Sequence, residues 1–404
     1  MDVITRNPLL RRILLASFVS GLGDRMHQVA LAALILSLTG SMVKAGLVFV
    51  VSTVPYVLFG LVVGALVDRW DRRSAMIGAD LARAALVAAI PVAAAINLPL
   101  VYLLLFATAC GRMVFTPAQQ AVLPELVDAD DLGAANSLVR AAQYLTDLVG
   151  YPIAAGAVVL LTGALGTAWG TQVAFALDAA SFLASALLLW QLPADASRAA
   201  RGAAGRLREQ IADGLQFMLA HPEIRANTML FVVGPLLLGS LHTLWVGFAW
   251  RVSNTGALGF GLTEALTGAG VLLGVCALPR ASAALNKGRI ILLGFALYGG
   301  AILAVGTTAS LPIAAALALF AGAGNVLFLV PSVTLVQQQT PADLRGRVLG
   351  VRLTLTYAAF ASSNALAGSL SDVVGVSLLM MLLGGGAVAM ASLAYLVPSA
   401  REAI

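Results

Sequence analysis

The sequence predicts an all-α membrane protein that crosses the bilayer twelve times. Hydrophobic residues make up 60% of its 404 positions and charged residues only 11%, whereas a soluble domain carries about 25% charged residues. Twelve apolar stretches, each able to form a spanning helix of about 20 residues, follow one another along the chain. One long polar connection, 193–223, divides these spans into two six-helix bundles.

The spans account for most of the chain and define its domains. Residues 1–192 are predicted to form the first bundle and residues 224–404 the second. Forty glycines fit close helix packing, because small residues let backbones approach where no hydrophobic force drives helices together. In order, the predicted spans are 12–38, 43–67, 74–96, 98–118, 133–162, 168–192, 224–250, 262–283, 289–308, 312–338, 347–371 and 376–397.

The connection 193–223 is predicted to be a cytoplasmic linker that contains one amphipathic helix. Its apolar residues recur at helical spacing, and arginines stand beside them. We expect this helix to lie along the membrane surface. The apolar positions are Leu207, Ile211, Leu215, Phe217 and Met218.

The net charge of +5 indicates topology rather than nucleic-acid binding. With the N-terminus inside, the outer loops hold only Lys44 and Arg251, while the inner segments are rich in arginine. This asymmetry follows the positive-inside rule, so we expect both termini in the cytoplasm and no nucleic-acid partner. The inner basic residues are Arg6, Arg11, Arg12, Arg69, Arg72, Arg73, Arg198, Arg201, Arg206, Arg208, Arg225, Arg280, Lys287, Arg289, Arg345, Arg347 and Arg401.

The two halves repeat one another weakly. Pro117 and Pro331 each stand near the end of the fourth span of their half, and an Asp-Leu pair opens the next helix in both, at Asp131 and Asp343. Transporters built from duplicated halves show such repetition.

A segment between the second and third spans, Gly64 to Arg73, combines a glycine, Asp68 four positions later, and a cluster of arginines. This segment resembles the signature loop of the major facilitator superfamily, and it has the same place in the chain. Further phrases resemble the exporter subfamily that includes enterobactin exporters and drug:proton antiporters. They are Gly23-Asp24, the segments 79–84, 117–124 and 175–182, Arg345-Gly346-Arg347, and the segment from Gly368 to Gly375.

The resemblance implies the major facilitator fold, in which two bundles enclose a central cavity that opens alternately to either side. It also implies a monomer. Asp68, with Arg69, Arg72 and Arg73, would then latch the cytoplasmic side against the N-terminus of the span that opens at Arg347, since a helix N-terminus attracts negative charge. The simpler alternative is that these arginines only keep the loop inside. The matching loop of the second half, 280–289, lacks the aspartate.

A segment of span five resembles the antiporter signature of the family. It runs from Gly150 through Pro152 to Gly156, and its glycines and proline permit close packing and a bend. In the family this feature goes with exporters. Generic helix packing explains the same residues.

Charged residues near the bilayer midplane are the candidate cargo and proton site, because each costs about 2.5–3.5 kcal/mol to insert. Asp24 and Arg25 lie mid-span in span one, Arg112 in span four and Asp147 in span five. The superfamily fold places these spans around the cavity, so the resemblance implies that the charges converge there. The alternative is that Arg112 and Asp147 form a permanent ion pair that specifies packing.

Other polar residues in the spans are expected to be structural or are further candidates for the cavity. Asp178 lies mid-span in span six, which is usually peripheral in the family. Asp80 and Arg83 are expected to be a structural pair. Glu264 either handles protons or cargo or is a surface carboxylate. The remaining candidates for the cavity are His242, Asn325, Tyr357 and Asn364.

No nucleotide-binding loop, metal-ligand cluster or catalytic spacing is present in the sequence, so we expect neither an enzyme nor a cofactor. Cys110 and Cys276 are expected to be core residues. The favoured function is proton-driven export of a small amphipathic compound, such as a drug, a siderophore or a natural product, across a bacterial cytoplasmic membrane. The alternatives are an importer or lysophospholipid transporter on the same fold, and a non-transporting sensor or scaffold.

Overall fold

The structure is a computed structural model that describes residues 6–67, 70–127, 131–192 and 207–396. The secondary structure within these ranges is entirely helical. By their contacts the residues divide into two compact units. Unit 1 comprises residues 1–38 and 54–204, and unit 2 comprises residues 39–53 and 205–404. The helix α3 (Met42–Val67) therefore belongs to unit 2 at its start and to unit 1 at its end.

Unit 1 is built from α2 (Pro8–Thr39), the second part of α3, α4 (Arg72–Ile96), α5 (Leu98–Leu126) and α6 (Leu132–Trp190). Side-chain caps fix the starts of two of these helices. Asp71 accepts a hydrogen bond from the backbone N–H of Ser74 at 2.8 Å, and Asn97 accepts one from Leu100 at 2.9 Å. Such caps satisfy N–H groups that have no partner within the helix.

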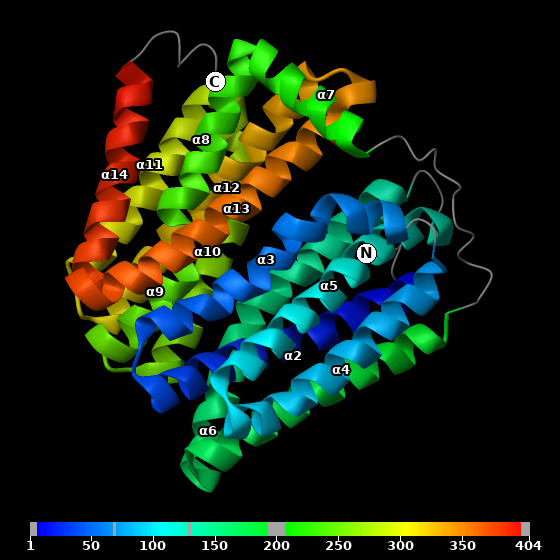
Figure 1. The fold of residues 1–404 in the computed structure, drawn as a ribbon. Coiled ribbons are helices and arrows are strands. Elements are labelled where there is room, and N and C mark those ends of the chain that lie inside the picture. Colours follow the sequence, from blue (N-terminus) through cyan, green and yellow to red (C-terminus); the bar gives the residue numbers. More distant parts are fainter. Residues whose placement is uncertain (1–5, 68–69, 128–130, 193–206, 397–404) are drawn as a thin grey trace. The chain divides into compact units, whose positions relative to one another are not determined.

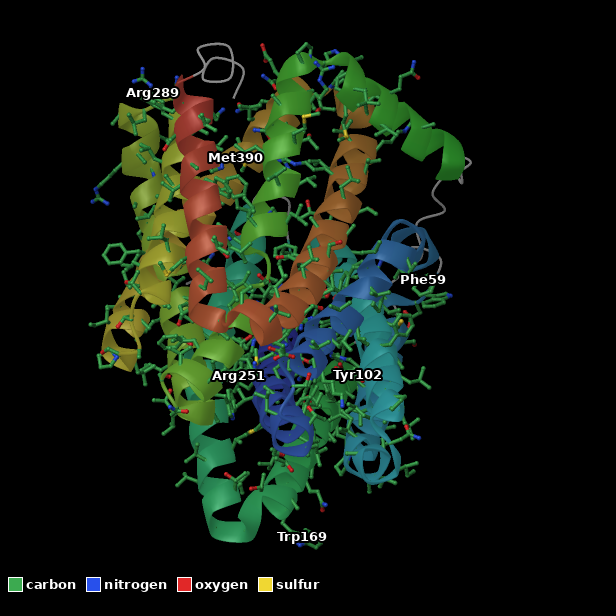
Figure 2. The ribbon with its side chains drawn as sticks, turned by 60° about the vertical axis from the view of Figure 1, so that its left-hand side comes forward. Phe59, Tyr102, Trp169, Arg251, Arg289 and Met390 are labelled. Carbon is green, nitrogen blue, oxygen red and sulfur yellow. The ribbon has the colours of Figure 1, made fainter. Side chains whose placement is uncertain are left out.

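The helix α6 is two membrane crossings joined by a break. Its 59 residues would reach about 88 Å as one straight helix, far more than the roughly 30 Å of a hydrocarbon core. At Gly166 the backbone leaves the helical region, with φ 79° and ψ 160°. There the chain turns back on itself (Figure 1), and Trp169 lies at this turn (Figure 2).

Unit 2 contains the remaining helices and packs closely through small residues. A Cβ added to Gly322 would lie 1.9 Å from the carbonyl oxygen of Thr267, and one added to Gly270 would lie 2.0 Å from that of Leu319. Side chains are thus excluded at these crossings. The elements are α7 (Leu207–Ala220), α8 (Pro222–Leu238), α9 (Leu241–Gly247), the π-helix η2 (Phe248–Val252), α10 (Gly256–Ala284), α11 (Lys287–Gly306), α12 (Leu311–Gln339), α13 (Ala342–Val374) and α14 (Val376–Leu396).

The predicted all-α membrane fold is confirmed. Within the described ranges, nine helical segments are long and apolar enough to cross a membrane. One of them, Leu148–Trp190, contains the break at Gly166 and so supplies two crossings. The longer and more polar helices α2 and α13 complete the predicted twelve.

The amphipathic helix predicted in the linker is present as α7. Its residue Met218 is buried with Ile224 and Val348 of the same unit. A Cβ added to Gly214 would lie 2.9 Å from the carbonyl oxygen of Arg347. The helix α7 therefore packs against the start of α13, while Leu215 remains 41% exposed.

Candidate functional site

A buried arginine, Arg83 on α4, is the centre of a charged network in unit 1. Its Nη1 atom lies 3.7 Å from Asp24 Oδ2 on α2, and its Nη2 atom donates a hydrogen bond to Asp80, one turn earlier on α4. Its guanidinium carbon lies 4.1 Å from the centroid of the Phe182 ring and 5.2 Å from that of Phe115. Two carboxylates and two aromatic rings therefore stabilise this buried cation.

Arg112 on α5 is the second cation beside Asp24. Its Nη1 atom lies 3.5 Å from the same Oδ2 atom of Asp24, so one carboxylate oxygen is within ion-pair distance of two arginines. The side chain of Arg112 is 42% exposed, against 9% for Asp24. Arg112 thus forms the accessible side of the network. The structure brings together two of the predicted cavity residues, Asp24 and Arg112.

A buried histidine–carboxylate pair lies next to this network. His27 follows Asp24 by one turn on α2, and its Nδ1 atom lies 2.7 Å from Asp178 Oδ2 on α6. The hydroxyl of Ser181 donates a hydrogen bond to the other oxygen of Asp178 at 3.3 Å. Asp178 is fully buried, and the side chain of His27 is 10% exposed. The spacing of His27 from Asp24, which places both on one helix face, could have indicated this pair, but its partner on α6 could not be read from the sequence.

Arg25 contacts a neighbouring polar group and an aromatic ring. It donates a hydrogen bond to Gln28 Oε1 at 3.0 Å, and its guanidinium lies 5.0 Å from the centroid of the Tyr151 ring. The Tyr151 hydroxyl donates to the same Gln28 oxygen at 2.8 Å. A Cβ added to the buried Gly150 would lie 3.0 Å from Arg25 Cγ. The first glycine of the antiporter-like segment therefore allows α2 to approach α6.

The rest of the antiporter-like segment has a different environment. Pro152 is exposed, and a Cβ added to Gly156 would meet no heavy atom within 4 Å. The packing explanation from the sequence therefore applies to Gly150 and not to Gly156.

Several predicted site residues cannot be placed in full. Asp68 and Arg69 of the signature loop lie outside the described residues. Gly64 lies in the last turns of α3, and Asp147 lies on α6 with its side chain outside the described part. The latch role of the loop and the pairing of Arg112 with Asp147 stay predictions.

The two described arginines of the signature loop, Arg72 and Arg73, connect three helices of unit 1. Arg72 is buried and donates a hydrogen bond from Nη1 to the carbonyl oxygen of Ala121 at 2.7 Å. Arg73 donates to the carbonyl oxygens of Leu189 and Trp190. These bonds tie the start of α4 to the ends of α5 and α6.

In unit 2 the structure brings together His242 of α9 and Glu264 of α10. The Nδ1 atom of His242 lies 2.6 Å from Glu264 Oε1, and the imidazole stacks on Phe49 with ring centroids 5.6 Å apart. The side chain of Glu264 is 4% exposed and that of His242 is 47% exposed. Glu264 is therefore a buried carboxylate and not the surface carboxylate that its sequence position also allowed.

The other predicted residues of unit 2 are polar groups within the helix bundle. Asn364 is buried and accepts a hydrogen bond from Thr243 Oγ1 at 2.7 Å. It also donates to the carbonyl oxygen of Gly239 at 3.2 Å. Those bonds give Asn364 a packing role between α9 and α13. The remaining two are half-buried: Asn325 on α12 and Tyr357 on α13.

A buried cation in unit 2, Arg352 on α13, is missing from the sequence predictions. Its guanidinium lies 3.6 Å from the centroid of the Phe231 ring and donates a hydrogen bond to the carbonyl oxygen of Ser332 at 3.1 Å. The internal repeat could have found it, since Arg352 follows Asp343 by the same interval as Arg140 follows Asp131.

The carboxylate of Asp372 caps the start of α3. It accepts hydrogen bonds from the backbone N–H groups of Met42 at 3.4 Å and Val43 at 3.3 Å. Arg251 donates to it at 2.6 Å and also donates to the carbonyl oxygen of Gly40 at 2.7 Å. A carboxylate in this position satisfies N–H groups at a helix N-terminus and interacts favourably with its dipole.

Buried charged side chains among long apolar helices, in a fold of twelve crossings, are typical of the class of secondary transporters. The family model of the transmembrane secretion effectors matches residues 5–402 of the chain. The protein belongs to this family, which is part of the major facilitator superfamily.

Individual relatives agree with the family. The chain is 30% identical over 397 residues to the multidrug efflux pump Tap of Mycolicibacterium fortuitum, and the match covers 94% of both chains. It is 33% identical over 140 residues to macrolide efflux protein A of Streptococcus pyogenes, a match that covers 34% of this chain and 35% of that protein. The solved structure of the nucleoside transporter NupG has the same fold, with a TM-score of 0.77 at 11% identity, covering 95% of this chain and 98% of the other. The protein is therefore a multi-pass transporter of the efflux type and not an enzyme.

Proposed function

We propose that the protein exports small amphipathic compounds from the bacterial cytoplasm in exchange for protons, with both termini inside the cell. The observation that supports this most strongly is the position of Asp24, a buried carboxylate within 3.7 Å of Arg83 and 3.5 Å of the more accessible Arg112. The names of the relatives, a multidrug efflux pump and a macrolide efflux protein, support export and antibiotic-like cargo.

The proposed exchange of a proton for cargo depends on the charge of Asp24. When the carboxylate binds a proton, it loses its attraction for the two arginines. Arg112 then changes its contacts at the accessible side of the network, where cargo would bind. When the proton leaves, the ion pairs form again. Proton and cargo thereby act on the same group of side chains, which is what an antiporter requires.

The chemistry of the network also limits the cargo. A carboxylate and a partly exposed arginine bind polar groups of either sign, while the surrounding helices are apolar. We therefore propose amphipathic cargo that carries a polar group of either charge.

A drug-susceptibility panel in an efflux-deficient bacterial host tests this function. The panel would contain ethidium, a macrolide, a tetracycline and a fluoroquinolone. We expect the wild-type protein to protect against at least one compound, and the variants Asp24→Asn, Arg112→Ala and Asp147→Asn to protect less at equal expression. Arg11→Ala, at an exposed position of α2, is the control and should protect fully. If the wild-type protein protects against none of these compounds, the proposed cargo class is wrong.

A further inference from the structure

We propose that His27 and Asp178 form a second proton-binding site of this exporter, beside Asp24. The inference rests on the proposed proton exchange and deepens it, because it names further groups, besides Asp24, that hold the transported proton. It assigns a role to an imidazole–carboxylate pair between α2 and α6, in place of the role expected for Asp178 as a structural residue of a peripheral span.

Asp178 is a buried carboxylate whose ion-pair partner is a histidine. Its side chain is fully buried and contacts His27 Nδ1 at 2.7 Å and the hydroxyl of Ser181 at 3.3 Å. Among the described residues, His27 is the one basic side chain within ion-pair distance of it. An ionised carboxylate in an apolar interior is costly unless a cation balances it. In this proposal one proton is therefore shared between the imidazole and the carboxylate.

Histidine suits this task because its ordinary pKa lies within the physiological range of pH. The chain has three histidines, and two of them contact a buried carboxylate, His27 in unit 1 and His242 in unit 2. His27 is the more enclosed of the two, with a side chain 10% exposed against 47% for His242. His27 is thus the less solvent-accessible of these two imidazoles.

The pair is linked to the Asp24 network by helix packing. A Cβ added to Gly23 would lie 2.2 Å from Asp178 Oδ1 and 2.0 Å from Ser181 Oγ, so α2 and α6 are in direct contact beside the pair. Loss of the proton weakens the attraction between the two helices at this contact. Because Asp24 lies on α2 next to Gly23, the change acts on the carboxylate that holds Arg112.

Other charged groups also act on the pair. Asp24 from α2 and Arg83 from α4 interact electrostatically with Asp178. Asp24 interacts in turn with Arg25, Arg83 and Arg112. Asp80 binds Arg83 from the same helix. Asp24 and Arg83 therefore act on the pair itself, and Arg25, Arg112 and Asp80 act on those two residues.

The test separates proton coupling from cargo exchange. Wild-type protein and the variants His27→Gln and Asp178→Asn would be reconstituted in liposomes, with ethidium as the cargo. Ethidium carries a permanent charge, so a pH gradient alone does not trap it. Two rates would be measured for each protein, namely ethidium exchange without a gradient and ethidium uptake driven by an acidic interior.

We expect both variants to keep exchange and to lose the uptake driven by the gradient. His221→Gln, at an exposed histidine between α7 and α8, is the matched control and should keep both rates. A structural role for the pair would lower both rates together, and that result would overturn the proposal. Uptake that stays coupled in His27→Gln but is lost in His242→Gln would also overturn it and would move the site to unit 2. If the wild-type protein itself ignores the gradient, the proposed proton exchange fails as well.

A second measurement tests the proposed role of His27 if the variants fail to fold. In a protein carrying His221→Gln and His242→Gln, His27 is the single remaining imidazole, and its protonation state can be followed by nitrogen NMR between about pH 5 and pH 8. We expect ethidium binding to change this state. An imidazole whose protonation is the same with and without ethidium at every pH would overturn the proposal.

Discussion

Arg83 is the residue on which the buried charges of unit 1 depend. It is the one side chain in the network that contacts both Asp24 and Asp80, and its buried guanidinium lies beside the rings of Phe115 and Phe182. Two carboxylates at this depth need a cation. Arg83 therefore balances the charge of both carboxylates.

Replacing Arg83 should destabilise the protein strongly. We expect Arg83→Leu to lower the free energy of unfolding by about 3–5 kcal/mol, because it leaves the buried Asp80 without its cation and Asp24 with one arginine in place of two. Thermal or denaturant unfolding of the purified protein would measure the change. Arg11→Leu, at an exposed position, is the control. Equal stability of the two variants would show that Arg83 does not balance the buried acids.

The sequence predicted individual buried charges better than their partners. Asp24, predicted to lie near the middle of its span, is buried, and the spacing of Asp80 and Arg83 was enough to pair them within one helix. The contacts of Asp24 with Arg83 and of His27 with Asp178 join different helices. They depend on how the helices pack, which a single sequence does not contain.

At the scale of the helices, glycines determine how closely the chain can pack and where it turns. The apolar runs alone predicted the helix bounds to within a few residues for most spans. The turn within α6 falls between the predicted spans 133–162 and 168–192, where Gly166 adopts a positive φ. Bounds are predictable because they follow from hydropathy, whereas close approaches such as that of Gly322 to Thr267 follow from the fold.

The turn at Gly166 should not tolerate a side chain. Its φ of 79° and ψ of 160° lie in a region that is essentially restricted to glycine, so Gly166→Ala should cost about 1–3 kcal/mol. Gly163→Ala, one turn earlier in regular helix and with open space around it, is the matched control. A thermal-unfolding comparison would measure both. A Gly166→Ala protein that unfolds at the same temperature as the control would contradict this turn geometry.

The crossing of α10 and α12 should be equally sensitive, for a different reason. At Gly322 the obstacle to a Cβ is backbone, the carbonyl of Thr267, which cannot rotate away. We expect Gly322→Ala to destabilise by about 1–3 kcal/mol through overpacking. Gly386→Ala on α14 would meet nothing within 4 Å and should leave stability nearly unchanged. Should the two variants prove equally stable in denaturant unfolding, the close approach of these helices would be wrong.

At the scale of the whole molecule, the chain is a membrane transporter of the major facilitator superfamily. One relative that it matches over 94% of both chains is a multidrug efflux pump. In our proposal, the free energy for export comes from a proton gradient. The buried acids and histidine of unit 1 are the groups through which, in our proposal, the proton gradient acts.

The most direct test of this proposal is the response of purified wild-type protein to an imposed pH gradient. Liposomes that contain the protein and an acidic interior should take up ethidium against its concentration gradient, and the uptake should stop when a protonophore removes the gradient. We predict this result for the wild type and its loss in Asp24→Asn. Ethidium uptake that proceeds at the same rate with and without the pH gradient would contradict proton-driven export.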